Sequence, residues 1–300
     1  MIELKEQIQK GIEISKQRRV DFKPEKIIFC AMGGSIIPAE IISMLWIDDL
    51  NCYLNRTAYL PDWAGKNHLV ICISWSGETE ETISCFKEAI GKNIPAVSIT
   101  KGGKLAKEAK ENNQILITLP KSNVPARYGA LTMTAAILTL LNNSDIIRYN
   151  LPESPEINRK SIVLLAKLQN RIPLIYSSYP WRYLASFWKI FFNETCKIPA
   201  FSNHLPSMAH NEIASMSTEF FPVILIGQDE NPQDLKVLNK FSLFLKSKSI
   251  EHEIIYIEGK DRLEKILNSY HLIIQTTNAL AKSLDLDPFE LKAVDEFKNI

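Results

Sequence analysis

The chain has 300 residues, enough for two domains of ordinary size that each bury a core of their own. Its 35 Lys and Arg residues nearly balance its 34 Asp and Glu residues. The net charge therefore does not indicate a basic surface for nucleic acid or an anionic membrane. No apolar run approaches the roughly 18 residues of a membrane-spanning helix. We therefore expect a soluble protein with neither a nucleic-acid nor a membrane partner.

The first 17 residues alternate charged and apolar side chains as a surface helix does, and they do not look like a secretory signal. The cysteines are odd in number and scattered, with no CxxC pair and no histidine at ligand spacing. This pattern predicts reduced thiols in a cytoplasmic protein, several of them packed in the core, and no metal site. They are Cys30, Cys52, Cys72, Cys85 and Cys196.

Short apolar runs alternate with amphipathic segments through the first half of the chain. Continuous apolar runs of this kind, separated by helix-length segments, are typical of a parallel sheet with helices on both faces. The first half is therefore predicted to be α/β. The expected strands are 26–32, 68–74, 94–100 and 114–120, and the expected helices are 1–17, 38–46, 80–92 and 101–112.

A polar segment with two prolines, residues 148–160, separates this half from the next, and we place a domain boundary there, giving domains 1–150 and 151–300. The second half repeats the order of strands and helices with little residue identity. We infer two similarly built α/β domains, with a site at the carboxyl ends of strands or between the domains. The expected strands are 172–178, 221–227 and 252–259, and the expected helices are 181–194, 231–248 and 261–286.

The sequence "SWSGET", residues 74–79, begins at the last residue of the strand predicted at 68–74 and precedes a helix. Hydroxyl side chains at Ser74, Ser76 and Thr79, a tight turn at Gly77 and a helix N-terminus together suit a phosphate monoester. The alternative, of about equal weight for this motif alone, is that Ser76 and Thr79 only cap the helix.

A second Gly/Ser turn, at Gly33, Gly34 and Ser35, also lies between an expected strand and an expected helix. Two such turns on neighbouring strands could converge on one ligand, which favours the anion site. The carboxylate of Glu78 would oppose a phosphate unless it points away. Neither a GxxxxGK[ST] nor a GxGxxG sequence is present, so a nucleoside triphosphate or dinucleotide is less favoured.

Two residues of the second half are candidates for chemistry. Glu194 closes an apolar, aromatic helix, a position that suits a carboxylate acting as a general base. By itself, an ordinary solvated glutamate at the end of a helix is the favoured interpretation. His210, in "MAHNEI", could be a packed or capping histidine, and its surroundings have no metal-binding spacing.

Five stretches of the chain resemble, in order, the motifs of the archaeal and bacterial bifunctional phosphoglucose/phosphomannose isomerases. They are "FCAMGGS", "SWSGETEET", "VPARYGALTMT", "FFNETCKIPAFSNHLPSMAHNEI" and the tail "TTNALAKSLDLDPFELKAVDEFK". The resemblance spans nearly the whole chain. It implies two sugar isomerase (SIS) domains, each an αβα sandwich with a parallel sheet flanked by helices, and an isomerase of hexose 6-phosphates that needs neither metal nor cofactor.

The resemblance also implies a role for each matching residue. Glu194 would move a proton between the first and second sugar carbons through a cis-enediol, and Arg127 would stabilise the enediolate. His210, supplied across a homodimer interface, and Lys298 would open and close the sugar ring. Taken alone, Arg127 could be a surface ion pair and Lys298 a solvated lysine. The phosphate would be bound by Gly34, Ser35, Ser74, Ser76 and Thr79.

The chain departs from the family pattern at three places. Ile36 is bulky at the first turn, and Ala209 stands where the family has Asn before the histidine. Residues 289–297 contain no Thr, Ser or Gln, whereas a threonine there is associated in the family with mannose 6-phosphate. Two other functions remain open: a non-catalytic phosphosugar sensor on the same scaffold, and an isomerase of another sugar phosphate.

Overall fold

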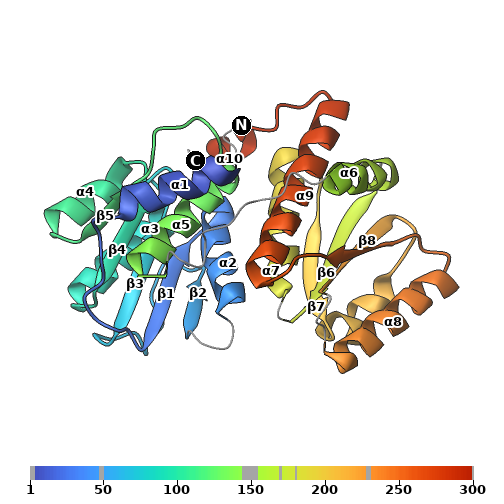
Figure 1. Ribbon diagram of the computed structural model, residues 1–300, viewed down its shortest axis with the longest axis horizontal. Coiled ribbons are helices and arrows are strands. Elements are labelled where there is room, and N and C mark those ends of the chain that lie inside the picture. Colours follow the sequence, from blue (N-terminus) through green and yellow to red (C-terminus); the bar gives the residue numbers. More distant parts are fainter. Residues whose placement is uncertain are drawn as a thin grey trace. The chain divides into compact units, whose positions relative to one another are not determined.

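The computed structural model describes residues 4–46, 51–143, 155–168, 171–179, 181–227 and 231–298. The chain forms two compact units, Met1–Asn150 and Leu151–Ile300, which are coloured blue to green and green to red in Figure 1. The predicted boundary between residues 150 and 151 lies outside the described residues.

The first unit is built on a five-stranded parallel sheet in the order β2-β1-β3-β4-β5. Its strands are β1 (Lys26–Ala31), β2 (Cys52–Asn55), β3 (His68–Ile73), β4 (Ala96–Thr100) and β5 (Ile115–Thr118). Its helices are α1 (Leu4–Ser15), α2 (Ile37–Leu45), α3 (Glu80–Gly91), α4 (Gly103–Glu111) and α5 (Ala130–Leu140). Helix α5 was not among the expected helices.

Helices cover both faces of this sheet. The side chains of α3 and α4 pack with one face of β1, β3 and β4 in a common core. Helix α5 packs with α1 and α2. Gly11 allows α1 to approach α5 closely, because a Cβ atom there would lie 2.3 Å from the Thr132 carbonyl oxygen. Strands covered on both faces need apolar residues at every position, which explains their continuous apolar runs.

The second unit has a four-stranded parallel sheet in the order β7-β6-β8-β9. Its strands are β6 (Ile172–Ser178), β7 (Phe201–Leu205), β8 (Phe220–Gly227) and β9 (Glu253–Ile257). Its helices are α6 (Pro155–Leu168), α7 (Arg182–Thr195), α8 (Pro232–Ser247), α9 (Arg262–Ser283) and α10 (Lys292–Lys298). Helix α8 packs on one face, and α9 packs with α6 and α7.

The polar segment predicted at 148–160 needs a correction, because residues 155–160 are not an irregular break but the first turns of α6. Pro155 is the first residue of the helix, where proline is tolerated because no backbone N–H is needed. The rest of the predicted segment, 148–154, lies outside the described residues.

The two sheets share one strand order, with β2-β1-β3-β4 in the first unit matching β7-β6-β8-β9 in the second. The predicted fold class, two α/β units with helix-covered parallel sheets, is confirmed. In such sheets the order reverses beside the first strand, and ligands bind outside the carboxyl ends of the strands at this point. In the first unit this point lies between β1 and β3.

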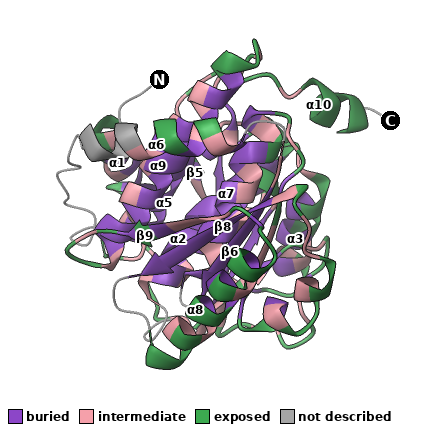
Figure 2. Cartoon of the chain, turned by 90° about the vertical axis from the view of Figure 1, so that its right-hand side faces the viewer, coloured by how far each residue is buried: buried purple, intermediate pink, exposed green. Residues whose placement is uncertain are grey.

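Burial follows the same layering. The strands are largely buried and the exposed residues gather on helices and loops, with α10 exposed at every residue (Figure 2). Across the described ranges, no helix combines the length and the apolar composition needed to cross a bilayer. All five cysteines are free, and four of them are buried.

Candidate functional site

Two Gly/Ser turns meet at the carboxyl edge of the first sheet. The register pairs Ala31 of β1 with Ile73 of β3, so the turns that follow these strands start side by side. The first turn is the short 3-10 helix Gly33–Ile36. Its Ser35 hydroxyl accepts a hydrogen bond of 3.2 Å from the Trp75 backbone N–H in the second turn. The two turns form one structure at the point where the strand order reverses.

The second turn is ordered by its own hydroxyl groups. The hydroxyls of Ser74 and Thr79 share a hydrogen bond of 2.8 Å, and the Ser74 oxygen accepts a bond of 3.0 Å from the Gly77 N–H. Ser76 accepts a bond of 3.2 Å from the Glu78 N–H, ahead of the helix. Ser74 is fully buried, whereas Ser76 is exposed and Thr79 is half-buried.

The alternative in which Ser76 and Thr79 only cap α3 is wrong. Thr79 occupies the N-cap position, yet among the described contacts no side chain makes a capping hydrogen bond to the first turn of α3. The N-terminal N–H groups and the positive end of the helix dipole are therefore left for an external acceptor. This is the arrangement that binds phosphate groups at helix N-termini.

Glu78 is turned to another helix. Its Oε1 atom accepts a hydrogen bond of 3.1 Å from the Lys104 backbone N–H in the first turn of α4, and its Oε2 atom lies 3.5 Å from Lys104 Nζ. The carboxylate caps α4 and is paired with a cation. This removes the objection that its charge would repel a phosphate at α3.

A third turn, the 3-10 helix Ala126–Gly129, packs against both of the others. A Cβ atom at Gly34 would lie 2.8 Å from the Arg127 backbone nitrogen, and one at Gly129 would lie 2.2 Å from the Trp75 ring. Trp75 Nε1 also donates a bond of 2.9 Å to the Val124 carbonyl. Arg127 itself is fully buried, with its guanidinium carbon 4.9 Å from the centre of the Tyr128 ring.

Lys101 brings a cation to this edge that the sequence reading did not predict. It follows β4 directly, and its Nζ atom lies 5.1 Å from the centre of the Trp75 ring and donates a bond of 2.8 Å to the Ser122 carbonyl. Partial burial lowers the pKa of Lys101, because desolvation disfavours the charged form. The available signal in the sequence was a lysine directly after a strand that is expected to end beside the Ser74–Thr79 turn.

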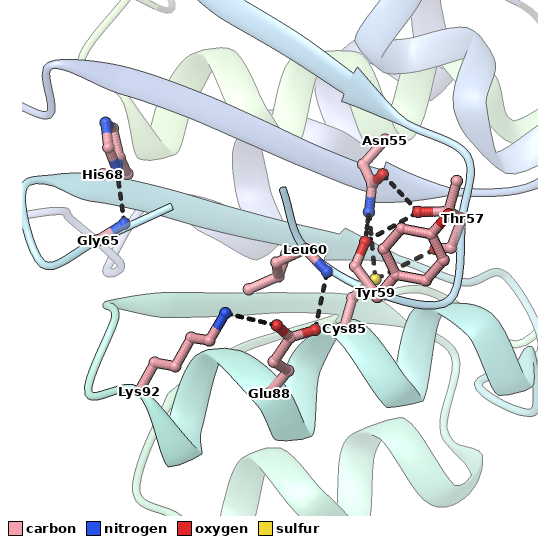
Figure 3. A network of polar contacts seen from close by, with 9 residues as sticks. All are labelled: Asn55, Thr57, Tyr59, Leu60, Gly65, His68, Cys85, Glu88 and Lys92. Carbon is pink, nitrogen blue, oxygen red and sulfur yellow. Dashed lines mark hydrogen bonds and ion pairs between the residues drawn. The ribbon is translucent and has the colours of Figure 1, made fainter. Parts of the chain in front are cut away.

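The body of α3 is anchored to the loop that follows β2 (Figure 3). The Leu60 N–H donates a bond of 2.8 Å to Glu88, which also receives one of 2.7 Å from Lys92. Asn55 and Cys85 hold the same loop through the carbonyls of Tyr59 and Thr57, at 2.9 and 3.2 Å.

Partial burial by itself would raise the pKa of Glu88, but the bonds from Lys92 and from the Leu60 N–H leave this pKa below its usual value. Glu88 therefore stays ionised and keeps α3 fixed. The helix whose N-terminus faces the Gly/Ser turns is thus held at its other end.

In the second unit, Glu194 lies in the last turn of α7 and is half-buried. Helix α7 runs from the carboxyl end of β6 to the amino end of β7, and these strands are parallel. Glu194 is therefore placed at the amino edge of the second sheet. Lys197 is close by, and its Nζ atom donates a bond of 2.7 Å to the Glu194 carbonyl.

His210 ends the short 3-10 helix Ser207–His210 after β7 and is exposed. The following Glu212 fixes this segment to the sheet, because its carboxylate accepts a bond of 2.8 Å from the Tyr176 hydroxyl and another from the Asn203 amide. Burial and the Glu212 carboxylate both raise the pKa of Tyr176, so its hydroxyl stays a proton donor. The sequence reading did not single out Tyr176, Asn203 or Glu212.

The predicted site residues thus fall into separate groups. The structure brings together Gly34, Ser35 and the Ser74–Thr79 turn, with the Arg127 backbone packed against Gly34. Glu194 and His210 lie at opposite edges of the second sheet. Lys298 ends the exposed helix α10.

Two further features lie outside these groups. The described residues bring no three His, Cys, Asp or Glu side chains together as a metal ion would require. An open hollow in the second unit borders Phe289–Lys292 together with Asp295 and Glu296.

Comparison with known proteins identifies the fold group first. The family described as "Bacterial phospho-glucose isomerase C-terminal SIS domain" matches residues 157–300. Among solved structures, the C-terminal domain of glucosamine-fructose-6-phosphate aminotransferase from Francisella tularensis superposes with a TM-score of 0.72 and 11% identity, covering 96% of each chain. The second unit is a SIS domain, and the likeness to the solved structure extends the same fold over the whole chain.

The sequence relatives then define the family. The bifunctional phosphoglucose/phosphomannose isomerase of Aquifex aeolicus is 31% identical over 293 residues, covering 93% of this chain and 91% of the relative. The D-glucosamine-6-phosphate 4-epimerase of Sulfolobus acidocaldarius is 26% identical over 290 residues, covering 91% and 88%. The chain belongs to the bifunctional phosphoglucose/phosphomannose isomerase family, as its motifs predicted, and it is an isomerase.

Proposed function

We propose that the chain interconverts glucose 6-phosphate and fructose 6-phosphate, and mannose 6-phosphate and fructose 6-phosphate. The single observation that carries this proposal is the uncapped N-terminus of α3 beside the Ser74–Thr79 turn, in a chain of this family. A phosphate monoester fits this position, because hydroxyl groups and the backbone N–H groups at the start of α3 converge there.

In this proposal the phosphate lies against the two Gly/Ser turns. Ser76 and Thr79 offer exposed or half-buried hydroxyls to it. Ser74 is buried and acts by orienting Thr79 and Gly77. Gly34 and Ser35 keep the first turn against the second, and Lys101 adds positive charge at the same edge.

The chemistry is assigned to four residues. Glu194 moves the proton between the first and second sugar carbons through a cis-enediol, as a general base. His210 and Lys298 open and close the ring at the anomeric and ring oxygens. Arg127 stabilises the enediolate charge. Because Arg127 is fully buried, a direct contact with the enediolate requires that substrate binding uncover it.

We also propose a homodimer, and the positions of Glu194 and His210 support it. They lie at opposite edges of one sheet, separated by the length of β7, about 15 Å for five residues. One substrate molecule cannot reach both in the same unit. We therefore propose that His210 is supplied by a second copy of the chain.

The reaction is proposed to need no metal ion and no cofactor, since proton transfer and ring opening are assigned to side chains. We also propose a cytoplasmic protein that serves glycolysis and gluconeogenesis, in keeping with five free cysteines.

The test is a coupled assay with glucose 6-phosphate and mannose 6-phosphate side by side, on wild type and on Glu194→Gln. We expect both substrates to give fructose 6-phosphate in wild type and neither to do so in the variant. Glu219→Gln, at an exposed residue before β8, is the matched control and should behave as wild type. Equal fructose 6-phosphate formation in wild type and Glu194→Gln would refute the assignment of the base.

EDTA treatment addresses the metal-free mechanism. We expect the rate to persist after EDTA, and a loss that added metal restores would contradict the proposal. Gel filtration with light scattering tests the homodimer.

A second candidate is an isomerase or epimerase of another sugar phosphate. It is favoured by the tail, which lacks Thr, Ser and Gln in residues 289–297, and by the relative named D-glucosamine-6-phosphate 4-epimerase. A substrate panel that includes glucosamine 6-phosphate separates the two. Saturable binding of all these sugar phosphates without any turnover would instead indicate a phosphosugar sensor.

A further inference from the structure

One ammonium group of the second unit holds three separate backbone carbonyls. Lys197 Nζ donates bonds of 2.7 Å to the carbonyl of Glu194, 3.2 Å to that of Asp287 and 2.6 Å to that of Glu290. A lysine ammonium has three protons, so these acceptors can engage all of its donors at once. Yet Lys197 is an exposed residue, at which a side chain ordinarily stays solvated.

The backbone is bent so that this side chain can turn back over the helix. Lys197 has a φ of +57°, in the left-handed region that residues with a Cβ atom disfavour. It directly follows Cys196, the C-cap of α7, and a cation there binds a carbonyl that has no partner within the helix. Asn193 holds the same turn by accepting a bond of 2.8 Å from the Ala200 N–H.

The other two carbonyls belong to the segment between α9 and α10. Helix α10 begins two residues after Glu290, and all of its residues are exposed (Figure 2). A short exposed helix of this kind gains little from burial, so its position depends on how the preceding segment is held. Lys298 lies about 9 Å along α10 from its first residue, at the helical rise per residue.

We propose that Lys197 is a positioning residue, which fixes the start of the Lys298-bearing tail against the end of α7 that bears Glu194. This inference rests on the proposed function where it concerns catalysis. Lys197 does not touch the substrate in this scheme. It acts through Lys298, by limiting where α10 can lie relative to Glu194.

The first test is hydrogen exchange of Lys197→Met against wild type, with Lys240→Met as the matched control at an exposed lysine on α8. We expect amides of residues 286–298 to exchange at least about tenfold faster in Lys197→Met only, because local opening becomes easier. Amides of β6 and β8 should be unchanged.

Steady-state kinetics give the second test. We expect Lys197→Met to lower kcat about tenfold with KM changed less than about twofold, because the Gly/Ser turns proposed to bind the phosphate are unchanged. Lys197→Arg keeps the cation and should recover part of kcat. In a Lys298→Met background, Lys197→Met should lower kcat much less, since a residue that acts through Lys298 has lost its target.

Chemical labelling of the wild-type protein needs no variant. An amine-acylating reagent followed by mass spectrometry should modify Lys197 at least about tenfold more slowly than Lys240, because the Lys197 donors are engaged. Equal labelling of the two lysines would show that Lys197 does not hold the three carbonyls, even if Lys197→Met does not fold.

The outcomes separate this inference from the proposed function. If hydrogen exchange of residues 286–298 is unchanged in Lys197→Met, Lys197 does not hold the tail in place, whatever the activity of the variant. If Lys197→Met lowers kcat as much in the Lys298→Met background as it does in wild type, Lys197 does not act through Lys298. Faster tail exchange in a protein whose wild type isomerises no hexose phosphate supports the positioning role of Lys197 and refutes the proposed function.

Discussion

A methyl group added at Gly77 should disrupt the turn after β3. Gly77 has a φ of +79°, and a Cβ atom built there would lie 1.9 Å from the Gly102 carbonyl oxygen and 2.7 Å from Thr100 Oγ1. The left-handed backbone and the required displacement of the Gly102 carbonyl each cost about 1–2 kcal/mol. We therefore expect Gly77→Ala to lower the free energy of unfolding by about 3 kcal/mol.

Gly91→Ala is the matched control for Gly77→Ala. Gly91 is the last residue of α3, and a Cβ atom there would meet nothing within 4 Å. Alanine should raise the free energy of unfolding by about 0.5 kcal/mol, because it restricts the unfolded chain. The two variants should therefore differ by about 3–4 kcal/mol.

Urea denaturation followed by far-UV circular dichroism measures this difference, fitted with two transitions if the two units unfold separately. Isothermal titration with fructose 6-phosphate, on the folded variants, should show at least about tenfold weaker binding by Gly77→Ala and unchanged binding by Gly91→Ala. Equal stability of the two alanine variants would refute the steric reasoning. Equal affinity would refute the assignment of this turn to the phosphate.

Three other changes have outcomes that the structure fixes. Arg56→Met removes the guanidinium paired with the fully buried Glu40 carboxylate, and urea denaturation should show a loss of about 3 kcal/mol, whereas an unchanged midpoint would contradict it. Glu88 has a lowered folded-state pKa, so its contribution to stability is present above its unfolded pKa of about 4.3 and is lost as the pH falls through the folded value. Thermal unfolding between about pH 6 and 3 should therefore show a shallower acid loss in Glu88→Gln than in wild type, and parallel curves would count against this. Tyr176→Phe removes the 2.8 Å bond to Glu212 and should lower the unfolding free energy by about 1.5 kcal/mol in the same urea assay, a wild-type value being the contrary result.

The central strands could be predicted because each is a continuous apolar run. The run at residues 172–178 is β6, and those at 26–32 and 68–74 exceed β1 and β3 by one residue each. Both β2 and β7 were missed. Each is an edge strand of four or five residues with several exposed or half-buried positions, so neither carries an apolar run.

Helix α5 was also missed, for a different reason. Ten of its eleven residues are buried, so it lacks the polar face by which an amphipathic helix is recognised. Short apolar segments of this kind cannot be told from buried strands by periodicity.

The candidate site was predictable only in its local parts. Glycine and serine at a strand end before a helix are local signals, and they indicated both turns. The two turns touch because β1 and β3 are neighbours in the sheet. The hydrogen bond between Trp75 and Ser35 shows this contact. The complete burial of Arg127 and the opposite-edge positions of Glu194 and His210 likewise follow from packing and strand order.

By itself the sequence determined the α/β class, the Gly/Ser turns and the family. Apolar runs and turn residues are local sequence patterns, and the order of the family motifs is read directly along the chain. Only the tertiary structure decided what Lys197 does. Its partners at Asp287 and Glu290 are 90 and 93 residues away along the chain. They are backbone carbonyls, which every residue carries, so no side chain in the sequence marks them as partners.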